Sequence, residues 1–248
     1  MRWDTIIGQQ PLQRMLQRCI VDDRIPQALL LTGHDGAGTT ALALAFARTV
    51  NCERPTRTGT AIAPCEECHA CRQSATLQHP NIRIITALPA AKESARSGDG
   101  EEQLPDEVVE ELRDGIRGLA DDPYSGLRLT NATTIRIGQI REVKRSLSLS
   151  AMQEGRRVVI ILNAEEMKTA AANACLKTLE EPHPDVTIIL TTSRPERLLQ
   201  TIVSRCQDLI VPPLDDNDVA AALLQRELCT EDEAMIVAPF AQGNLQRA

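Results

Sequence analysis

The stretch ALLLTGHDGAGTTALALAFARTV, residues 28–50, decides the fold of this chain. It begins with a short apolar run, Ala28–Thr32, which suits a strand buried on both faces of a parallel sheet. A glycine-rich loop, Gly33–Thr40, leads directly into the alanine- and leucine-rich segment Ala41–Val50, which we expect to be a helix. Strand, glycine loop and helix in this order direct backbone amides and a helix dipole at an anion. The stretch therefore predicts an α/β fold with a phosphate-loop turn.

Further apolar runs follow this stretch and alternate with helical segments, and one more helical segment precedes it. We expect strands at Asn81–Thr86, Arg157–Leu162 and Val186–Thr191, and helices at Pro11–Val21, Ile140–Leu149 and Thr169–Glu180. Buried strands that alternate with helices predict a parallel sheet with helices on both faces.

Beyond the double proline Pro212-Pro213 the expected elements are all helical. They are Asp215–Glu227, Glu231–Ala241 and the start of a third helix at Gly243–Ala248. We therefore predict an α/β domain over residues 1–211 and a small helical lid domain over residues 212–248, hinged at the prolines.

Composition excludes several classes of protein. The 248 residues are 42% hydrophobic and 25% charged, which excludes collagen-like and wholly disordered chains. Only four residues are aromatic, too few for a platform that stacks nucleic-acid bases. No apolar run approaches the roughly 20 residues of a membrane helix, and the N-terminus lacks a signal peptide's apolar core, so we expect a soluble, cytoplasmic chain without membrane contact.

One segment carries nearly all of the negative charge. Residues 88–131, the acidic insertion, hold eleven acidic and five basic side chains, a balance of −6 against −7 for the whole chain. Within it we expect a mobile linker at Ala91–Gln103 and an acidic helix at Pro105–Leu119. We expect the insertion to pack at the edge of the first domain or to be partly mobile. We predict no catalytic role for it, and its surface should face away from DNA because it repels phosphate.

Eight cysteines without an export signal favour metal binding or core packing over disulfides. Cys65, Cys68 and Cys71 form two C-x-x-C steps, and Cys52 lies thirteen positions upstream of Cys65. This spacing predicts a structural zinc site with four thiolates in a loop-rich module, residues 51–78.

Two alternatives to the four-cysteine site remain open on the sequence. His69 or His79 replaces one cysteine, or the metal has been lost. The other cysteines are scattered on apolar faces and are expected in the core: Cys19, Cys175, Cys206 and Cys229.

Several motifs together resemble a known family. WDTIIGQ (residues 3–9), the glycine loop, the four clustered cysteines, KTLEEP (residues 177–182) and SRC (residues 204–206) occur in the order found in bacterial clamp-loader subunits, which are AAA+ proteins. The resemblance covers residues 1–248 apart from the acidic insertion. It implies membership of the DNA polymerase III holoenzyme and of the machine that uses ATP to place a ring-shaped sliding clamp on primed DNA.

The resemblance also implies partners. They are the gamma/tau ATPase and delta subunits of the loader, and through the complex the sliding clamp and primer-template DNA. Relatives usually carry a C-terminal helical collar domain after the two domains predicted here, and we expect it to be absent from this chain.

The same resemblance locates an ATP site, from which this chain departs at three positions. Thr39 stands where the ATPases carry the lysine that neutralises the β and γ phosphates, and threonine supplies no positive charge. Leu162 and Asn163 stand where an Asp-Glu pair binds magnesium and polarises the attacking water. Glu165 and Glu166 lie past those positions.

We therefore expect no ATP binding and no intrinsic catalysis. The glycine loop is interpreted as a degenerate phosphate loop retained as a structural turn, with the residues Gly33, Gly36, Gly38, Thr39 and Thr40.

Arg205 of the SRC motif carries the functional hypothesis. The resemblance implies an arginine finger, which acts in trans on the ATP of a neighbouring subunit. The alternative is that Arg205 caps the C-terminal end of a helix at Glu196–Val203. Thr192 and Ser193 resemble a polar sensor position but more plainly end a strand, and Arg247 resembles a second sensor only weakly.

Three functions compete on the sequence. The first is a non-hydrolysing scaffold subunit that donates Arg205. The second is an active, gamma/tau-like clamp-loader ATPase that tolerates the three departures. The third, a zinc-dependent nucleic-acid-binding module, lacks a basic patch because Cys65–Cys71 contains two glutamates and no Lys or Arg.

Overall fold

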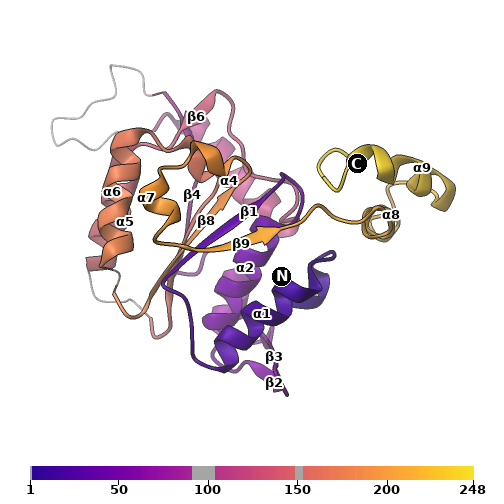
Figure 1. Ribbon diagram of the computed structural model, residues 1–248, viewed down its shortest axis with the longest axis horizontal. Helices are drawn as coiled ribbons and strands as arrows, with labels where there is room; N and C mark the ends of the chain where they lie inside the picture. Colours follow the sequence, from indigo (N-terminus) through magenta and orange to yellow (C-terminus); the bar gives the residue numbers. More distant parts are fainter. Residues whose placement is uncertain (1, 91–103, 149–152, 182) are drawn as a thin grey trace.

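The computed structural model describes residues 2–90, 104–148, 153–181 and 183–248. Its centre is a five-stranded parallel sheet in the order β4-β7-β8-β1-β9 (Figure 1). The strands are β1 (Ala28–Gly33), β4 (Ile82–Ile85), β7 (Arg157–Ile161), β8 (Val186–Thr192) and β9 (Gln207–Val211). The predicted parallel α/β sheet is confirmed, and β9 is an edge strand that the sequence did not predict.

Helices cover both faces of the sheet and follow it at the C-terminal end. They are α1 (Gln10–Val21), α2 (Thr39–Val50), α3 (His69–Ala75), α4 (Asp106–Asp121), α5 (Ile137–Ser148), α6 (Thr169–Glu180), α7 (Gln200–Val203), α8 (Asp216–Gln225) and α9 (Glu231–Ala241). Short 3-10 turns lie at η1 (Trp3–Thr5), η3 (Ala164–Glu166) and η4 (Pro195–Arg197). Among the described helices, none combines the length and apolarity that crossing a membrane requires.

Alternation along the buried strands divides the core between the two faces. In β1, Leu29 and Leu31 join a cluster with α1 and α2, whereas Ala28 and Leu30 join a second cluster with α5 and α6. Successive strand side chains point to opposite faces, so a wholly apolar strand serves both cores.

The acidic insertion contributes a helix to the first of these clusters. Leu119 of α4 is fully buried, and Val108, Leu112 and Ile116 are partly buried against the same cluster. Their spacing of three or four residues places them on one helix face while the acidic residues occupy the other. The predicted linker Ala91–Gln103 lies outside the described residues.

Two small antiparallel strand pairs add to the expected elements. The cysteine module contains the hairpin β2 (Thr56–Thr58) and β3 (Ala61–Ala63), and the insertion is bracketed by the pair β5 (Leu88–Pro89) and β6 (Ala132–Thr134).

The helix expected at Glu196–Val203 is instead η4 followed by α7. The backbone is extended at Leu198 and Leu199, whose side chains pack partly buried against the second core cluster, and this interrupts the helix.

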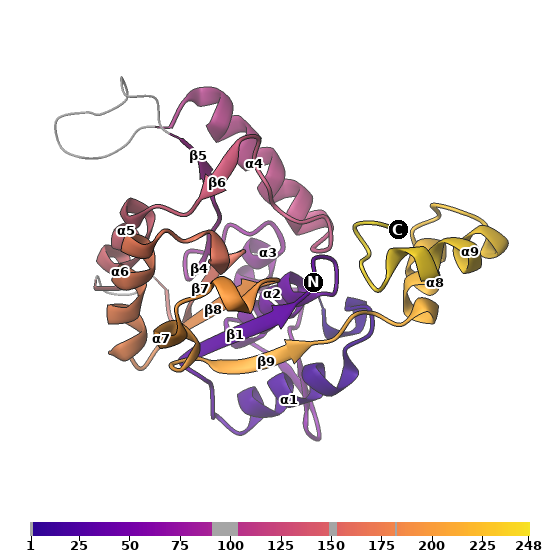
Figure 2. The same ribbon diagram turned by 45° about the horizontal axis from the view of Figure 1, so that its top comes forward.

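The C-terminal segment 243–248 forms turns rather than the expected third helix. Gln242 and Gly243 adopt positive φ, which ends α9, and the chain folds back until Leu245 N–H donates to the Gly36 carbonyl at 3.4 Å. The lid helices α8 and α9 lie to one side of the sheet in Figure 2, and α4 ends on that same side.

Candidate functional site

The glycine loop joins β1 to α2 and forms one wall of a cleft. Gly36 and Gly38 have φ of 73° and 102°, values that favour glycine, and Gly38 is the N-cap of α2. The strand ends at Leu162–Asn163 and Thr191–Ser193 form a second wall. This is where parallel sheets place their ligand sites, at the carboxyl ends of the strands.

The third wall comes from segments far away in the sequence. Residues 123–128 of the insertion, except Ser125, and Gln246 from the chain's C-terminal segment line the same cleft. A Cβ built on Gly38 would lie 3.2 Å from the Tyr124 hydroxyl, and one on Gly36 would lie 2.3 Å from Asn244 Oδ1. Close packing against the Leu245 backbone, 2.7 Å from such a Cβ, therefore requires glycine at position 36 apart from any ligand, and positive φ favours glycine at position 38.

The residues of the cleft do not fit a magnesium-bound triphosphate. Thr39 begins α2 where a cation is needed, and Leu162 is a buried apolar side chain, 3% exposed. Asn163 occupies a left-handed conformation and its N–H donates to Thr191 Oγ1 at 3.2 Å. Arg128 brings a guanidinium to the loop, but that group pairs with Asp35 at 3.0 Å. No step through ATP is derived for this cleft.

The two acids past β7 take other roles. Glu165 Oε1 accepts a hydrogen bond from Ser193 Oγ at 3.1 Å, which ties η3 to the end of β8. Burial raises the pKa of Glu166, which disfavours the ionised form that binds magnesium. Within the described ranges, the grouping of potential metal ligands contains cysteines and no carboxylates.

The sensor-like residues Thr192 and Ser193 line the cleft. Thr192 Oγ1 accepts from Arg194 N–H at 3.1 Å and closes the turn after β8. Arg247 is exposed, and its N–H donates to the Asn244 carbonyl at 3.0 Å.

The four clustered cysteines converge on one point. The sulfurs of Cys52, Cys65, Cys68 and Cys71 all lie within 4.8 Å of one another, and Cys52 and Cys68 are 4.0 Å apart. A tetrahedral zinc with bonds of about 2.3 Å requires sulfur–sulfur edges of about 3.8 Å. The four residues therefore fit a tetrahedral metal ion and can hold one.

Backbone amides support this centre. The N–H groups of Cys65, Cys68 and Cys71 donate to cysteine sulfurs at 3.2, 3.4 and 3.3 Å. The bond from Cys68 lowers the pKa of Cys65 to about 6, whereas burial raises the pKa of Cys71. Buried sulfurs that receive amide hydrogen bonds suit thiolates neutralised by a cation.

Histidine does not join this cluster in the described chain. His79 is buried, and its Nδ1 accepts a hydrogen bond from Asn81 N–H at 3.1 Å. The lone pair of that nitrogen is therefore engaged in a hydrogen bond and is not offered to a metal. Of the other cysteines, only Cys175 is fully buried, and Cys19, Cys206 and Cys229 are half-buried.

Arg205 follows α7 in the sequence and lies near the C-terminal end of α6 in space. Its Nη2 lies 2.8 Å from Glu180 Oε1, and its Nη1 donates to the Thr201 carbonyl at 2.9 Å. The side chain remains 36% exposed. The contact with Thr201 is the capping interaction that the sequence left as the alternative, and the exposure leaves the guanidinium accessible to a neighbour.

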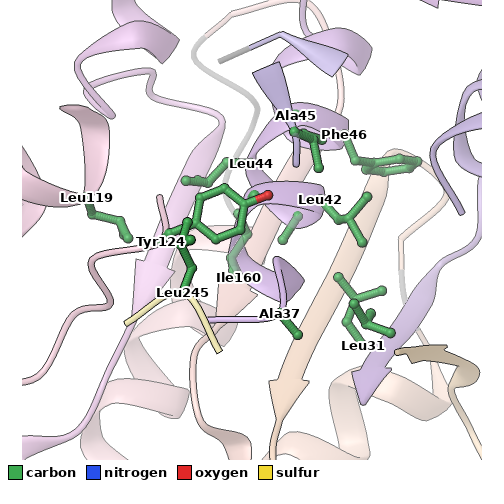
Figure 3. Packing of buried hydrophobic residues seen from close by; sticks show 14 of the residues in the cluster. Leu31, Ala37, Leu42, Leu44, Ala45, Phe46, Leu119, Tyr124, Ile160 and Leu245 are labelled. Carbon is green, nitrogen blue, oxygen red and sulfur yellow. The ribbon is translucent and has the colours of Figure 1, made fainter. Parts of the chain in front are cut away.

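Sequence reasoning missed Tyr124 as a residue of the cleft. Its ring is 3% exposed, and its hydroxyl accepts from Ile7 N–H at 2.8 Å, across 117 positions of sequence. Figure 3 shows the ring within the core cluster, with the hydroxyl pointing away from Leu119. The one usable signal was the presence of a lone tyrosine within a strongly acidic segment.

The strand order, the glycine loop between β1 and α2, and the helices after the last strand define an α/β protein of the AAA+ class. A Holliday junction branch migration motor, RuvB of Thermotoga maritima, shares this fold with a TM-score of 0.50 at 16% identity, over 98% of this chain and 60% of that one. The chain belongs to the family described as DNA polymerase III, delta subunit, which matches residues 8–215.

Two curated relatives are DNA polymerase III delta' subunits. That of Bacillus subtilis (strain 168) is 27% identical over 227 residues, which is 91% of this chain and 54% of the relative. That of Pseudomonas aeruginosa (strain PAO1) is 32% identical over 185 residues, which is 75% of this chain and 43% of the relative. The chain spans about half the length of these relatives.

Proposed function

We propose that this chain acts as a non-hydrolysing subunit of the bacterial clamp loader, and that it supports the loading of a sliding clamp onto primed DNA during replication. Its partners would be the gamma/tau ATPase and delta subunits, and through them the clamp and primer-template DNA. The delta' relatives and the family match support this role. No catalysis of its own is needed for it.

One observation carries the non-hydrolysing part of the proposal. The cleft at the glycine loop offers Thr39, Leu162 and Asn163 where a cation and two carboxylates are required. The loss of all three groups removes phosphate neutralisation, magnesium binding and activation of water together. An active gamma/tau-like ATPase would need at least the cation, and the guanidinium of Arg128, which lines the cleft, is paired with Asp35.

We further propose that Arg205 acts in trans on the ATP of an adjacent subunit. Its guanidinium is partly exposed, and its ion pair with Glu180 is also exposed to solvent, so a phosphate can replace the carboxylate at modest cost. An arginine supplies the planar fork that grips phosphate oxygens.

Zinc is proposed as the occupant of the cysteine centre, in a structural role. Four protein ligands leave no open position for chemistry. The module is joined to α2 by the ion pair between Arg48 and Glu66 at 3.1 Å, so the metal would hold this loop-rich segment against the α/β domain.

Reconstitution tests the function directly. This chain is mixed with the gamma/tau and delta subunits, and assembly is measured by co-purification. ATP hydrolysis of the complex is then measured with primed DNA and clamp. Failure to co-purify would reject the clamp-loader role, and measurable turnover by this chain alone would revive the ATPase alternative.

A further inference from the structure

The insertion wedge, residues 122–128, joins four parts of the molecule at the glycine-loop cleft. It follows directly after α4, and its Tyr124 lies in the core cluster together with Leu245 and Ala37 (Figure 3). A segment that a clamp-loader resemblance does not explain thus lines the cleft at which a phosphate-loop protein receives its ligand.

The first contact is with the N-terminal segment. Tyr124 Oη accepts from Ile7 N–H at 2.8 Å and lies 3.4 Å from the Ile7 carbonyl, to which it donates. Burial raises the pKa of Tyr124 to about 12, so the phenol is neutral and able to do both.

The second contact is with the glycine loop. Tyr124 packs on Gly38, and Arg128 pairs with Asp35 at 3.0 Å. The wedge therefore meets the loop with an aromatic ring at one end and a cation at the other.

The third contact is with the lid. Arg226, at the end of α8, donates to Asp122 Oδ1 at 2.9 Å, and its guanidinium lies 5.6 Å from the centre of the Tyr124 ring. The same Asp122 oxygen accepts from Tyr124 N–H at 2.9 Å, which orients the turn toward Arg226. The pair is part-buried, so solvent screens it less than a fully exposed pair.

A fourth contact is with the C-terminal segment. A Cβ built on Gly126, which has positive φ, would lie 2.8 Å from Gln246 Nε2. Leu245 in turn lies against the glycine loop through its bond to the Gly36 carbonyl.

We propose that the insertion wedge stands in for a nucleotide, because it forms one wall of the glycine-loop cleft and couples the lid to the α/β domain. Within the chain, Tyr124 joins the glycine loop to the N-terminal segment, and Arg128 pairs with Asp35 of the loop. Asp122 accepts a hydrogen bond from Arg226 of the lid. The lid orientation is thereby independent of ATP, which suits a scaffold among ATPases. The inference rests on the proposed function only in that the cleft takes no nucleotide.

Hydrogen exchange of this chain, measured by mass spectrometry, tests the coupling. Tyr124→Phe removes the two hydrogen bonds to Ile7, and Arg226→Gln removes the charge that meets Asp122. Arg226→Gln should speed exchange in α8 by about fivefold, because one net hydrogen bond is lost, and Tyr124→Phe, which loses two, should speed it at least as much. Arg117→Gln is the matched control, since it removes the exposed ion pair of Arg117 with Asp114 on α4 and should leave α8 unchanged.

The outcomes are distinct. Unchanged exchange in α8 for both Tyr124→Phe and Arg226→Gln, with native circular dichroism, would overturn the coupling. Protection of residues 33–40 in the wild-type chain by millimolar ATP and magnesium would overturn the replacement itself. Neither measurement involves the other loader subunits, so a failure here is distinguishable from a failure of assembly.

Discussion

The guanidinium of Arg205 lies 2.8 Å from the carboxylate of Glu180, measured between Nη2 and Oε1. The contact joins the KTLEEP motif at the end of α6 to the SRC motif after α7, two motifs that the sequence singles out separately. Both side chains are partly exposed, 36% for Arg205 and 47% for Glu180. The pair thus holds the guanidinium in one orientation without burying it.

Arg205→Ala should leave the chain folded and able to join the loader, yet slow ATP hydrolysis by the adjacent subunit. Where such fingers dominate they contribute roughly 10³–10⁵ in rate, and the fall in total turnover will be smaller because the complex has other ATP sites. The measurement is clamp- and DNA-stimulated ATPase activity of the reconstituted complex.

Two further variants separate the finger from the helix cap. Arg205→Lys should rescue turnover poorly if the planar fork binds phosphate, and well if the residue only caps α7. Arg197→Ala, an exposed arginine eight positions upstream, should have no effect. Unchanged turnover with Arg205→Ala would leave this chain as a scaffold alone.

Glu180→Gln should change the free energy of unfolding by less than about 1 kcal/mol, because exposed ion pairs contribute little. If Glu180 positions the finger, this variant should also lower turnover of the complex, though less than Arg205→Ala does, since the Thr201 carbonyl still accepts from Arg205. Urea unfolding and the ATPase assay measure the two effects. A fall as large as that of Arg205→Ala would contradict a merely positioning role.

Calorimetric titration of the isolated chain with ATP and magnesium should show no binding. The cleft lacks a phosphate-facing lysine and both acids, and Tyr124 lies against its glycine loop. Thr39→Lys alone should not restore hydrolysis, because Leu162 and Asn163 still leave magnesium and water without ligands. Micromolar affinity of the wild-type chain would refute the expectation.

Elemental analysis of protein purified without chelator should find one zinc per chain. Cys68→Ser should release the metal and loosen residues 51–78 while the parallel sheet stays folded, since the buried cluster of this module consists of three cysteines and Ala70. Cys229→Ser, which lies outside the centre, should retain the metal. Absence of zinc from wild-type protein would reject the assignment.

The ion pair between Arg157 and Asp185, 2.9 Å apart, should make stability depend on pH. Burial opposes ionisation of Asp185, but hydrogen bonds from Arg157 and His183 outweigh it and hold the pKa of Asp185 below its usual range. The ionised group therefore stabilises the fold above the unfolded-state pKa of about 3.9. This contribution is lost as the pH falls through the lower native value.

Asp185→Asn should accordingly lower the free energy of unfolding by about 1 kcal/mol at neutral pH, after allowance for its partial exposure. The difference in unfolding free energy between this variant and wild type should vanish once the pH falls below the native pKa of Asp185. Urea unfolding across the pH range measures it. Asp4→Asn, which removes an exposed pair with Arg2, is the control and should show no such pH dependence.

Local patterns in the sequence determined the class of fold, the cysteine centre and the departures of the glycine-loop cleft from an ATP site. Apolar runs such as Val158–Ile161 predict buried parallel strands, and the spacing of Cys65, Cys68 and Cys71 predicts a metal centre, because strand burial and C-x-x-C geometry are set within a few residues. The departures at Thr39, Leu162 and Asn163 are likewise readable one residue at a time. The sequence did not predict β9, whose residues Gln207–Val211 alternate in exposure at the sheet edge.

Only the tertiary structure decided what lies against the glycine loop and what holds Arg205. Tyr124 meets Ile7 across 117 positions, and Arg226 meets Asp122 across 104, distances over which no periodicity carries information. The docking of α4 on the core sets the first contact, and the fold of the lid against the body sets the second. Such contacts depend on how whole helices and strands pack against one another. That packing decides which distant side chains meet, and the neighbouring residues in the sequence do not.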